Sequence, residues 1–388
     1  MTPQDYYGWT RCFALFSDLD NDPVIAAFYE LLKEPSPNTY ARFAGLLYKA
    51  GTVNWTEYLS AQVLCHENGC TLLASHGKPI PAQMLTAAKT ELYALSEMAL
   101  LAPDFFDIYG YKAPWIVQDD CDLYPLWLER LFEADKHGYG MFAKYRMFRY
   151  EDGRLVPIVH ADPVRLSDLV GYETQKAALM NDFRALLEGL PASNVLLYGD
   201  AGTGKSASVK AAVNELADEG LRLVEIGKGE LKGLPALLDR LSNEALKFVV
   251  FIDDLSFGSS DESFSALKAV LEGSAAARSV NTVICATSNR RHLVRETFAD
   301  REGGEIHRND SMQETVSLSE RFGLRLYYEK PDKSLYLRIV HELAQKAGVD
   351  DAGLDLIAER YALGKAGRSA RAARQLVELL AADNKEGI

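Results

Sequence analysis

Eight residues near the middle of the chain, 199–206 with the sequence GDAGTGKS, constrain the fold more than any other segment. They match the pattern Gly-x-x-x-x-Gly-Lys-Ser/Thr and follow a short apolar run, residues 195–198, that is typical of a buried strand. A helical stretch that reaches Asp218 and ends at Gly220 comes directly after them. Glycines in such a strand-to-helix turn let backbone N–H groups face a phosphate. The motif therefore predicts a phosphate-binding loop in an α/β sheet, with Lys205 reaching the terminal phosphates and Ser206 a ligand of Mg²⁺.

Short apolar runs alternate with helical stretches on both sides of this loop. We expect strands at residues 195–198, 223–226, 248–252, 283–287 and 324–328. Continuous apolar strands that alternate with helices indicate a parallel sheet covered on both faces. The strand pattern stops at Lys333, and residues 334–347, 353–361 and 369–381 predict a C-terminal helical domain.

The first part of the chain has a different pattern. All four tryptophans lie before residue 160, in segments whose apolar residues recur every three or four positions, so this part is expected to be mainly helical. Residues 141–150 and 154–160 flank the turn formers Glu151-Asp152-Gly153 and predict a hairpin. We therefore expect three domains: a helical N-terminal domain ending in the hairpin (1–162), a nucleotide-binding α/β domain (163–332) and a helical lid (333–388). The N-terminal domain is a candidate recognition domain, with a structural cover for the α/β domain as the alternative.

Polar residues follow two of the expected strands at their carboxyl ends. Asp253 and Asp254 come after the apolar run 248–252, and Asn289 follows the run 283–287. In open α/β sheets, ligands bind beside the carboxyl ends of the strands. Asp253 is expected to hold Mg²⁺, Asp254 to orient or deprotonate an attacking water, and Asn289 to position that water.

The order of these motifs resembles that of the AAA+ ATPases. It comprises the phosphate loop (Walker A), the acidic strand end (Walker B), a strand ending in Thr-Ser-Asn, an arginine before a strand and a helical lid with its own arginine. The segment 168–172 (DLVGY) is similar to the one that lines the adenine pocket in that family. More narrowly, the strings IDDLSF, CATSNRRHL and SLSERFGL resemble a bacterial AAA+ family catalogued only as a domain of unknown function. The general resemblance covers residues 163–388.

The resemblance implies a role for each matching residue. Asn289 corresponds to the first sensor of the γ-phosphate, Arg321 to the finger that reaches a neighbouring subunit's nucleotide, and Arg371 to the second sensor, with Arg368 as the alternative for that last role. Asp253 and Ser206 correspond to the metal ligands and Asp254 to the catalytic carboxylate that orients or deprotonates the water. The residues expected to bind the nucleotide are Val170, Gly171, Gly199, Asp200, Ala201, Gly202, Thr203, Gly204, Lys205, Ser206 and Ala207.

Two departures from the family pattern bear on activity. The family usually has glutamate where this chain has Asp254, and the shorter side chain implies slow turnover. The loop 227–233 (GKGELKG) lacks the aromatic residue of protein-threading members, which disfavours an unfoldase pore. The resemblance implies an oligomeric, ATP- and Mg²⁺-dependent ATPase that remodels or loads a protein partner not identified by the sequence. The alternatives are a nucleotide-gated binding module with little hydrolysis and a P-loop small-molecule kinase.

Composition restricts the partners and the location. Lys and Arg number 42 against 55 Asp and Glu, a formal net charge of −13, which does not favour nucleic acid. The chain shows no membrane-length apolar run and no secretory pattern at its start, so we expect a cytoplasmic protein without a membrane segment. Its five scattered cysteines indicate reduced thiols, and Cys65, His66 and Cys70 lack the second ligand pair of a zinc site. The charged stretch 290–308 is expected to be a surface loop, or alternatively an interface.

Overall fold

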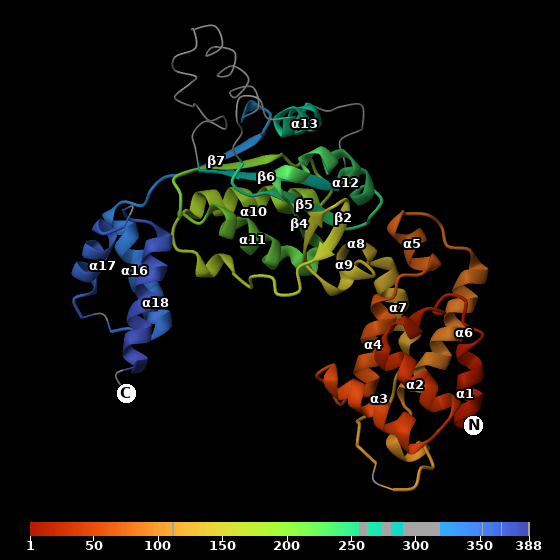
Figure 1. The fold of residues 1–388 in the computed structure, drawn as a ribbon. Helices are drawn as coiled ribbons and strands as arrows, with labels where there is room; N and C mark the ends of the chain where they lie inside the picture. The colour runs from red at the N-terminus through yellow and green to blue at the C-terminus, as the bar shows by residue number, and fades with distance from the viewer. Residues whose placement is uncertain are drawn as a thin grey trace. The chain divides into compact units, whose positions relative to one another are not determined.

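The computed structural model describes residues 1–110, 112–255, 262–272, 281–289, 319–350, 352–365 and 367–386. Within them the chain forms two compact units, residues 1–144 and 145–388 (Figure 1). The charged stretch 290–308 lies outside the described residues. None of the helices in the described ranges is long and apolar enough to cross a membrane.

The first unit is helical, as expected. Several of its helices begin at a side-chain N-terminal cap. For example, the Asp22 side chain accepts hydrogen bonds from the backbone N–H groups of Val24 and Ile25, and Pro23 occupies the first helical position. The unit contains α1 (Pro3–Thr10), α2 (Pro23–Lys33), α3 (Pro37–Lys49), α4 (Trp55–Cys65), α5 (Gly69–Ser75), α6 (Ala82–Ala99), α7 (Leu123–Phe132), α8 (Ala134–His137) and α9 (Met141–Lys144).

Aromatic side chains fill the interior of this unit. Trp55 and Trp127 are fully buried, and the ring of Trp55 packs on that of Phe28 with 4.3 Å between centroids. The indole of Trp115 lies edge-on to Phe43 at 5.0 Å. Aromatic pairs of this kind contribute stability beyond the area that they bury. Much of the aromatic content that suggested a recognition domain is thus used in the unit's own core.

The second unit contains the expected strands and further helices. Each of the five runs predicted from the sequence is a strand, with boundaries shifted by at most two residues. The elements are β1 (Met147–Glu151), β2 (Arg154–Pro157), α10 (Glu173–Leu187), β3 (Val195–Gly199), α11 (Lys205–Leu216), β4 (Leu221–Ile226), α12 (Leu234–Leu241), β5 (Lys247–Ile252), α13 (Glu262–Leu271), β6 (Thr282–Ser288), β7 (Leu324–Tyr328), α16 (Lys333–Ala347), α17 (Leu354–Leu363) and α18 (Ala370–Glu386).

The described strands form one seven-stranded sheet in the order β2-β1-β4-β5-β6-β3-β7. Only the β1–β2 pair is antiparallel among its neighbouring pairs. The expected fold class, a P-loop parallel sheet with flanking helices, a helical N-terminal part and C-terminal helices, is confirmed.

The hairpin is present, but our assignment of it to the helical N-terminal domain is wrong. Strand β1 runs parallel to β4, with Phe148 opposite Val224 and Tyr150 opposite Ile226. The hairpin therefore extends the sheet of the second unit, and the first compact unit ends at Lys144. Buried side chains on β1, among them Phe148, are better satisfied by this sheet than by an isolated two-stranded hairpin.

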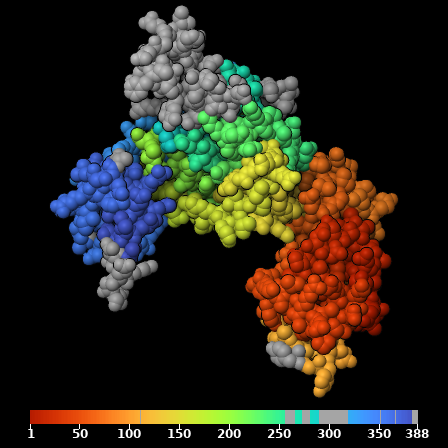
Figure 2. Space-filling model, in the orientation of Figure 1, coloured from red at the N-terminus to blue at the C-terminus, as the bar shows by residue number. Residues whose placement is uncertain are grey.

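Helices cover the sheet, with α10 and α11 on one side and α12 and α13 on the other (Figure 1). Phe183 of α10 and Val213 of α11 pack in one buried cluster with Leu197 and Phe251 of the sheet. This packing fixes α11, whose first turn carries the phosphate-loop lysine and serine, against the central strands. The C-terminal helices form a second buried cluster around Tyr336, Ala358 and Leu376. In the space-filling view these blue helices adjoin the yellow-green part of the sheet unit (Figure 2).

Candidate nucleotide-binding site

The phosphate loop connects α11 to the carboxyl end of β3, a strand that lies between β6 and β7 in the sheet. Gly199 has a φ of +130°, and a Cβ atom there would lie 2.2 Å from the carbonyl oxygen of Tyr328. No side chain larger than hydrogen fits at that position. Gly202 and Gly204 also have positive φ, and the Thr203 hydroxyl donates to the Asp200 carbonyl at 2.9 Å. The loop therefore has the strand-to-helix geometry expected from its sequence.

Lys205 lies folded over this loop. Its Nζ donates to the carbonyl oxygens of Asp200 at 2.6 Å and Gly199 at 3.2 Å, and the residue is 5% exposed. Burial lowers the pKa of the ammonium group, while the nearby carboxylates of Asp200, Asp253 and Asp254 oppose that shift. A buried cation hydrogen-bonded to carbonyl oxygens is well suited to exchange those partners for an anion.

Two strand ends and the start of α11 meet beside the lysine. The Ser206 hydroxyl, at the start of α11, donates to Asp253 Oδ1 at 2.6 Å, and Asp253 follows β5 directly. The Thr287 hydroxyl, near the end of β6, donates to the same carboxylate oxygen at 2.6 Å. The structure thus brings together Ser206 and Asp253, the two residues predicted to bind Mg²⁺.

The donor set of this pair fits a hard cation. A hydroxyl and a carboxylate from different elements offer oxygen ligands only. The described residues contain no group of three or more His, Cys, Asp or Glu side chains that could hold a metal by themselves. Mg²⁺ does not need such a group, because it keeps several waters and uses phosphate oxygens beside one or two carboxylates.

Asp254 and Asn289 lie on the other side of the same cluster. The Asn289 amide donates to Asp254 Oδ1 at 2.7 Å. Asp254 itself has a φ of +52°, in the left-handed region that residues other than glycine seldom adopt. The predicted water-activating carboxylate and the predicted sensor amide are therefore in direct contact.

The segment predicted to line the adenine pocket lies between the phosphate loop and the C-terminal helices. Val170 packs against the cluster of the C-terminal helices, and a Cβ at Gly171 would come within 2.7 Å of Leu335 Cδ1. The pKa of Asp168 is lowered by a hydrogen bond from the Arg165 backbone and by one from Lys346 of α16, whose Nζ donates to Asp168 Oδ1 at 3.1 Å. A pocket here is lined by Asp168, Leu169, Val170, Gly171, Tyr172, Lys176, Thr203, Gly204, Ser208, Ile339, Leu343, Ala370 and Arg374.

The two candidate arginines of the lid are used differently. The backbone N–H of Arg371 donates to the Gly202 carbonyl at 3.2 Å, which places the first turn of α18 on the phosphate loop. Arg368 instead makes two hydrogen bonds with the Glu359 carboxylate, at 2.9 and 2.7 Å, and is held within the lid. Of the two arginines, Arg371 is thus the one whose backbone lies at the phosphate loop.

Arg321 lies near the amino ends of the parallel strands, whereas the phosphate loop lies at their carboxyl ends. Strand β7 runs parallel to β3, with Leu324 opposite Val195 and Tyr328 opposite Gly199. The strand from Leu324 to Tyr328 spans about 13 Å, and Arg321 precedes it by three further residues. Its guanidinium pairs with the Glu272 carboxylate at 3.2 Å. Arg321 is thus far from the loop of its own chain.

Sequence reasoning missed several polar residues of this region. Thr287 was seen as part of a strand but given no role, although a hydroxyl at the end of an apolar strand was the available signal. Arg374 lines the pocket from the same helix as Arg371. The Asp200 carboxylate accepts a hydrogen bond from the Lys330 backbone at 3.0 Å, which connects the loop to the segment leading into the lid. No single-sequence pattern pointed to that connection.

Comparison with known proteins identifies the family. A family model described as "Protein of unknown function (DUF815)" matches residues 142–384. No curated protein matches the chain. Similar solved structures include a RuvB variant from Thermotoga maritima (18% identity, TM-score 0.38), the RuvB Holliday junction branch migration motor of that organism (19%, 0.38) and the FIGL-1 AAA domain in complex with ADP (21%, 0.40).

These structural matches are partial. Each RuvB match covers 56% of this chain and 63% of the RuvB chain, less than two thirds of its length. The FIGL-1 match covers 60% of this chain and 77% of that one. At this level of similarity no activity passes from those proteins to this one.

Proposed function

This chain belongs to the DUF815 family and has a parallel sheet with a phosphate-loop motif, and from that premise we propose that it is an AAA+ ATPase that binds ATP with Mg²⁺ and hydrolyses it to ADP and phosphate. The observation that carries the proposal is that Lys205, Ser206 and Asp253 lie close together at the carboxyl ends of the parallel strands. Their side chains supply a buried cation, a hydroxyl and a carboxylate beside a glycine-rich loop. This is the combination that a metal-bound triphosphate requires.

Each residue of the site has a part in the reaction. Backbone N–H groups of residues 199–206 and the Lys205 ammonium bind the phosphates. Ser206 and Asp253 would hold Mg²⁺, which when bound neutralises charge on the phosphate oxygens. Asp254 accepts the proton of the attacking water or orients it, and Asn289, in contact with Asp254, positions that water against the terminal phosphate. Arg371 contacts the nucleotide from the lid.

We further propose that the active enzyme is an oligomer in which Arg321 reaches the nucleotide of a neighbour. Support comes from the position of Arg321 before the amino end of β7, away from its own phosphate loop at the carboxyl ends of the strands. The same position speaks against the small-molecule kinase, in which Arg321 would act within one subunit. The activity would remodel or load a protein partner, because the net charge of −13 does not favour nucleic acid. Its proposed location is the cytoplasm.

A nucleotide-gated binding module with little hydrolysis is the second candidate. It is favoured by the short Asp254 side chain, whose Oδ1 is already bonded to the Asn289 amide. A single-turnover measurement separates the two functions. Hydrolysis of bound ATP within minutes supports the ATPase, and ATP that stays intact on the protein supports the gated module.

The proposal is tested by three substitutions in the full chain. Lys205→Ala should abolish ATP binding measured by calorimetry, because it removes the buried cation of the loop. Asp253→Asn should weaken binding only when Mg²⁺ is present. Asp254→Asn should leave binding intact and lower kcat by roughly 100-fold or more.

Circular dichroism serves as the control for folding of each variant. Unchanged ATP affinity in folded Lys205→Ala protein would refute nucleotide binding at this loop. Equal kcat in the wild type and Asp254→Asn would refute the role of Asp254.

A further inference from the structure

Thr287 forms hydrogen bonds with the turn after β5 that carries Asp253 and Asp254, and none of the roles described above accounts for them. It is 2% exposed and lies near the carboxyl end of β6. Its hydroxyl accepts a hydrogen bond from the Asp254 backbone N–H at 2.9 Å and lies 2.6 Å from Asp253 Oδ1. Its carbonyl oxygen accepts from the Leu255 backbone N–H at 2.7 Å. One residue thus holds three consecutive residues of the turn after β5.

The chemistry of a hydroxyl fixes the direction of these bonds. A threonine hydroxyl has one hydrogen to donate and two lone pairs to accept with. The backbone N–H of Asp254 can only donate, and an ionised Asp253 carboxylate can only accept. The single hydroxyl hydrogen therefore points at Asp253 Oδ1, and the orientation of that carboxylate depends on it.

The same bonds stabilise an unfavourable backbone conformation. Asp254 has a φ of +52°, which costs about 1 kcal/mol for a residue with a side chain. The hydrogen bonds to Thr287 from Asp254 and Leu255 compensate that cost on both sides of the α-carbon. The left-handed turn separates the two carboxylates, so that Asp253 contacts Ser206 while Asp254 contacts Asn289.

We propose that Thr287 is a positioning residue that assigns the two adjacent aspartates their separate roles. It keeps Asp253 directed at Ser206 and holds Asp254 in the turn that faces Asn289. The inference rests on the proposed function for its consequence in hydrolysis, whereas the positioning itself can be measured without nucleotide.

The test compares Thr287→Val with Thr287→Ser in the full chain. Valine keeps the branched shape and removes the hydroxyl, and serine keeps the hydroxyl and removes the methyl group. Thr282→Val, the same change at the other end of β6, is the matched control. Hydrogen–deuterium exchange without nucleotide is followed at the Asp254 and Leu255 amides.

In Thr287→Val the Asp254 amide should exchange about 5-fold faster, the equivalent of one net hydrogen bond of about 1 kcal/mol. The Leu255 amide should change less, because its acceptor is the backbone carbonyl of residue 287. Thr287→Ser and Thr282→Val should match the wild type at both amides.

The second measurement is the Mg²⁺ dependence of ATP binding together with kcat. Thr287→Val should need more Mg²⁺ and lose about 10- to 100-fold in kcat, as is usual when a partner that orients a metal ligand is removed. ATP binding in EDTA should stay unchanged, since the phosphate loop is intact. Thr287→Ser should restore both properties.

Two results would overturn the inference. One is wild-type exchange at Asp254 with wild-type Mg²⁺ dependence in Thr287→Val. The other is a uniform acceleration at both amides that serine does not rescue, which indicates a role in packing alone. If the wild type binds no ATP, the proposed function fails, and the exchange measurement still decides whether Thr287 positions the turn.

Discussion

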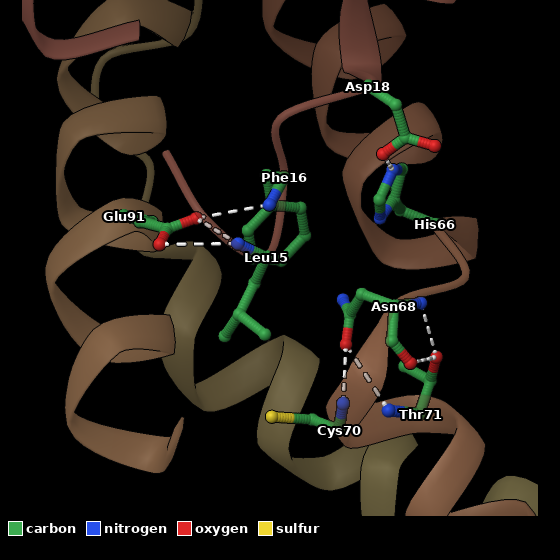
Figure 3. A network of polar contacts seen from close by, with 8 residues as sticks. All are labelled: Leu15, Phe16, Asp18, His66, Asn68, Cys70, Thr71 and Glu91. Atoms are coloured by element: carbon green, nitrogen blue, oxygen red, sulfur yellow. Dashed lines mark hydrogen bonds and ion pairs between the residues drawn. The ribbon is translucent and has the colours of Figure 1, made fainter. Parts of the chain in front are cut away.

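At the scale of single residues, one buried carboxylate in the first unit accepts hydrogen bonds from several backbone N–H groups and so fixes a segment of the chain. Glu91 of α6 is 6% exposed and accepts hydrogen bonds from three successive backbone N–H groups, of which Figure 3 shows those of Leu15 and Phe16. Oε1 lies 2.9 Å from the Ala14 nitrogen, and Oε2 lies 3.0 Å from those of Leu15 and Phe16. The carboxylate thereby gives these three N–H groups the hydrogen-bond acceptor that they would otherwise find in water.

Glu91→Gln should lower the free energy of unfolding of this unit by about 2 kcal/mol. The amide keeps the shape but loses the charge, and its NH₂ group faces backbone donors. Urea unfolding followed by tryptophan fluorescence reports on this unit, since all four tryptophans lie before residue 145.

Glu129→Gln, an exposed change on α7, is the control and should shift the midpoint little. Equal midpoints for Glu91→Gln and the wild type would show that the three N–H groups find other partners at no cost.

The candidate site illustrates which residues a single sequence can reveal. That Lys205, Ser206 and Asp253 lie close together was predictable from the sequence, because a phosphate-loop motif restricts both residue type and spacing. Thr287 was not, because threonine in a strand is ordinary β-sheet chemistry until its partners are known. The Arg371 and Arg368 alternatives could be separated only by tertiary contacts, namely the Gly202 carbonyl for one and Glu359 for the other.

At the scale of elements, the core strands were predictable and the hairpin's partner was not. Apolar runs such as 248–252 identify buried parallel strands by themselves. The hairpin at residues 147–157 was recognised from its turn, yet nothing local indicates that β1 pairs with β4, more than seventy residues later. The strand with which β1 pairs, and the register of that pair, depend on which outer strand of the sheet is free to pair. That depends on how the whole sheet is assembled.

The place of the hairpin gives a prediction about where the chain can be divided. A fragment of residues 145–388 keeps β1 and β2 on the sheet and should be soluble and bind ATP like the full chain. A fragment of residues 163–388 lacks both strands and exposes the edge of β4, which invites aggregation. Solubility after expression and calorimetry with ATP measure the difference. Equal behaviour of the two fragments would contradict a stabilising role for the hairpin.

At the scale of the whole molecule, the position of Arg321 makes the proposed enzyme depend on its neighbours. The guanidinium pairs with Glu272 in its own chain, and both side chains remain partly exposed, so exchange for a stronger anion is feasible. A neighbour's terminal phosphate is such an anion. Arginine fingers of this kind contribute roughly 10³- to 10⁵-fold in rate.

The last prediction is complementation between two inactive variants. Lys205→Ala chains keep the finger, and Arg321→Ala chains keep the phosphate loop, so mixed oligomers contain some sites with both. In a random equal mixture about a quarter of head-to-tail interfaces combine the two intact residues, and about a quarter of wild-type ATPase activity should return. Recovery should rise with protein concentration, because the complete site exists only between subunits. Each variant alone at the same total concentration is the control. A mixture that co-assembles in light scattering yet stays inactive at every concentration would place the action of Arg321 within its own subunit and favour the kinase.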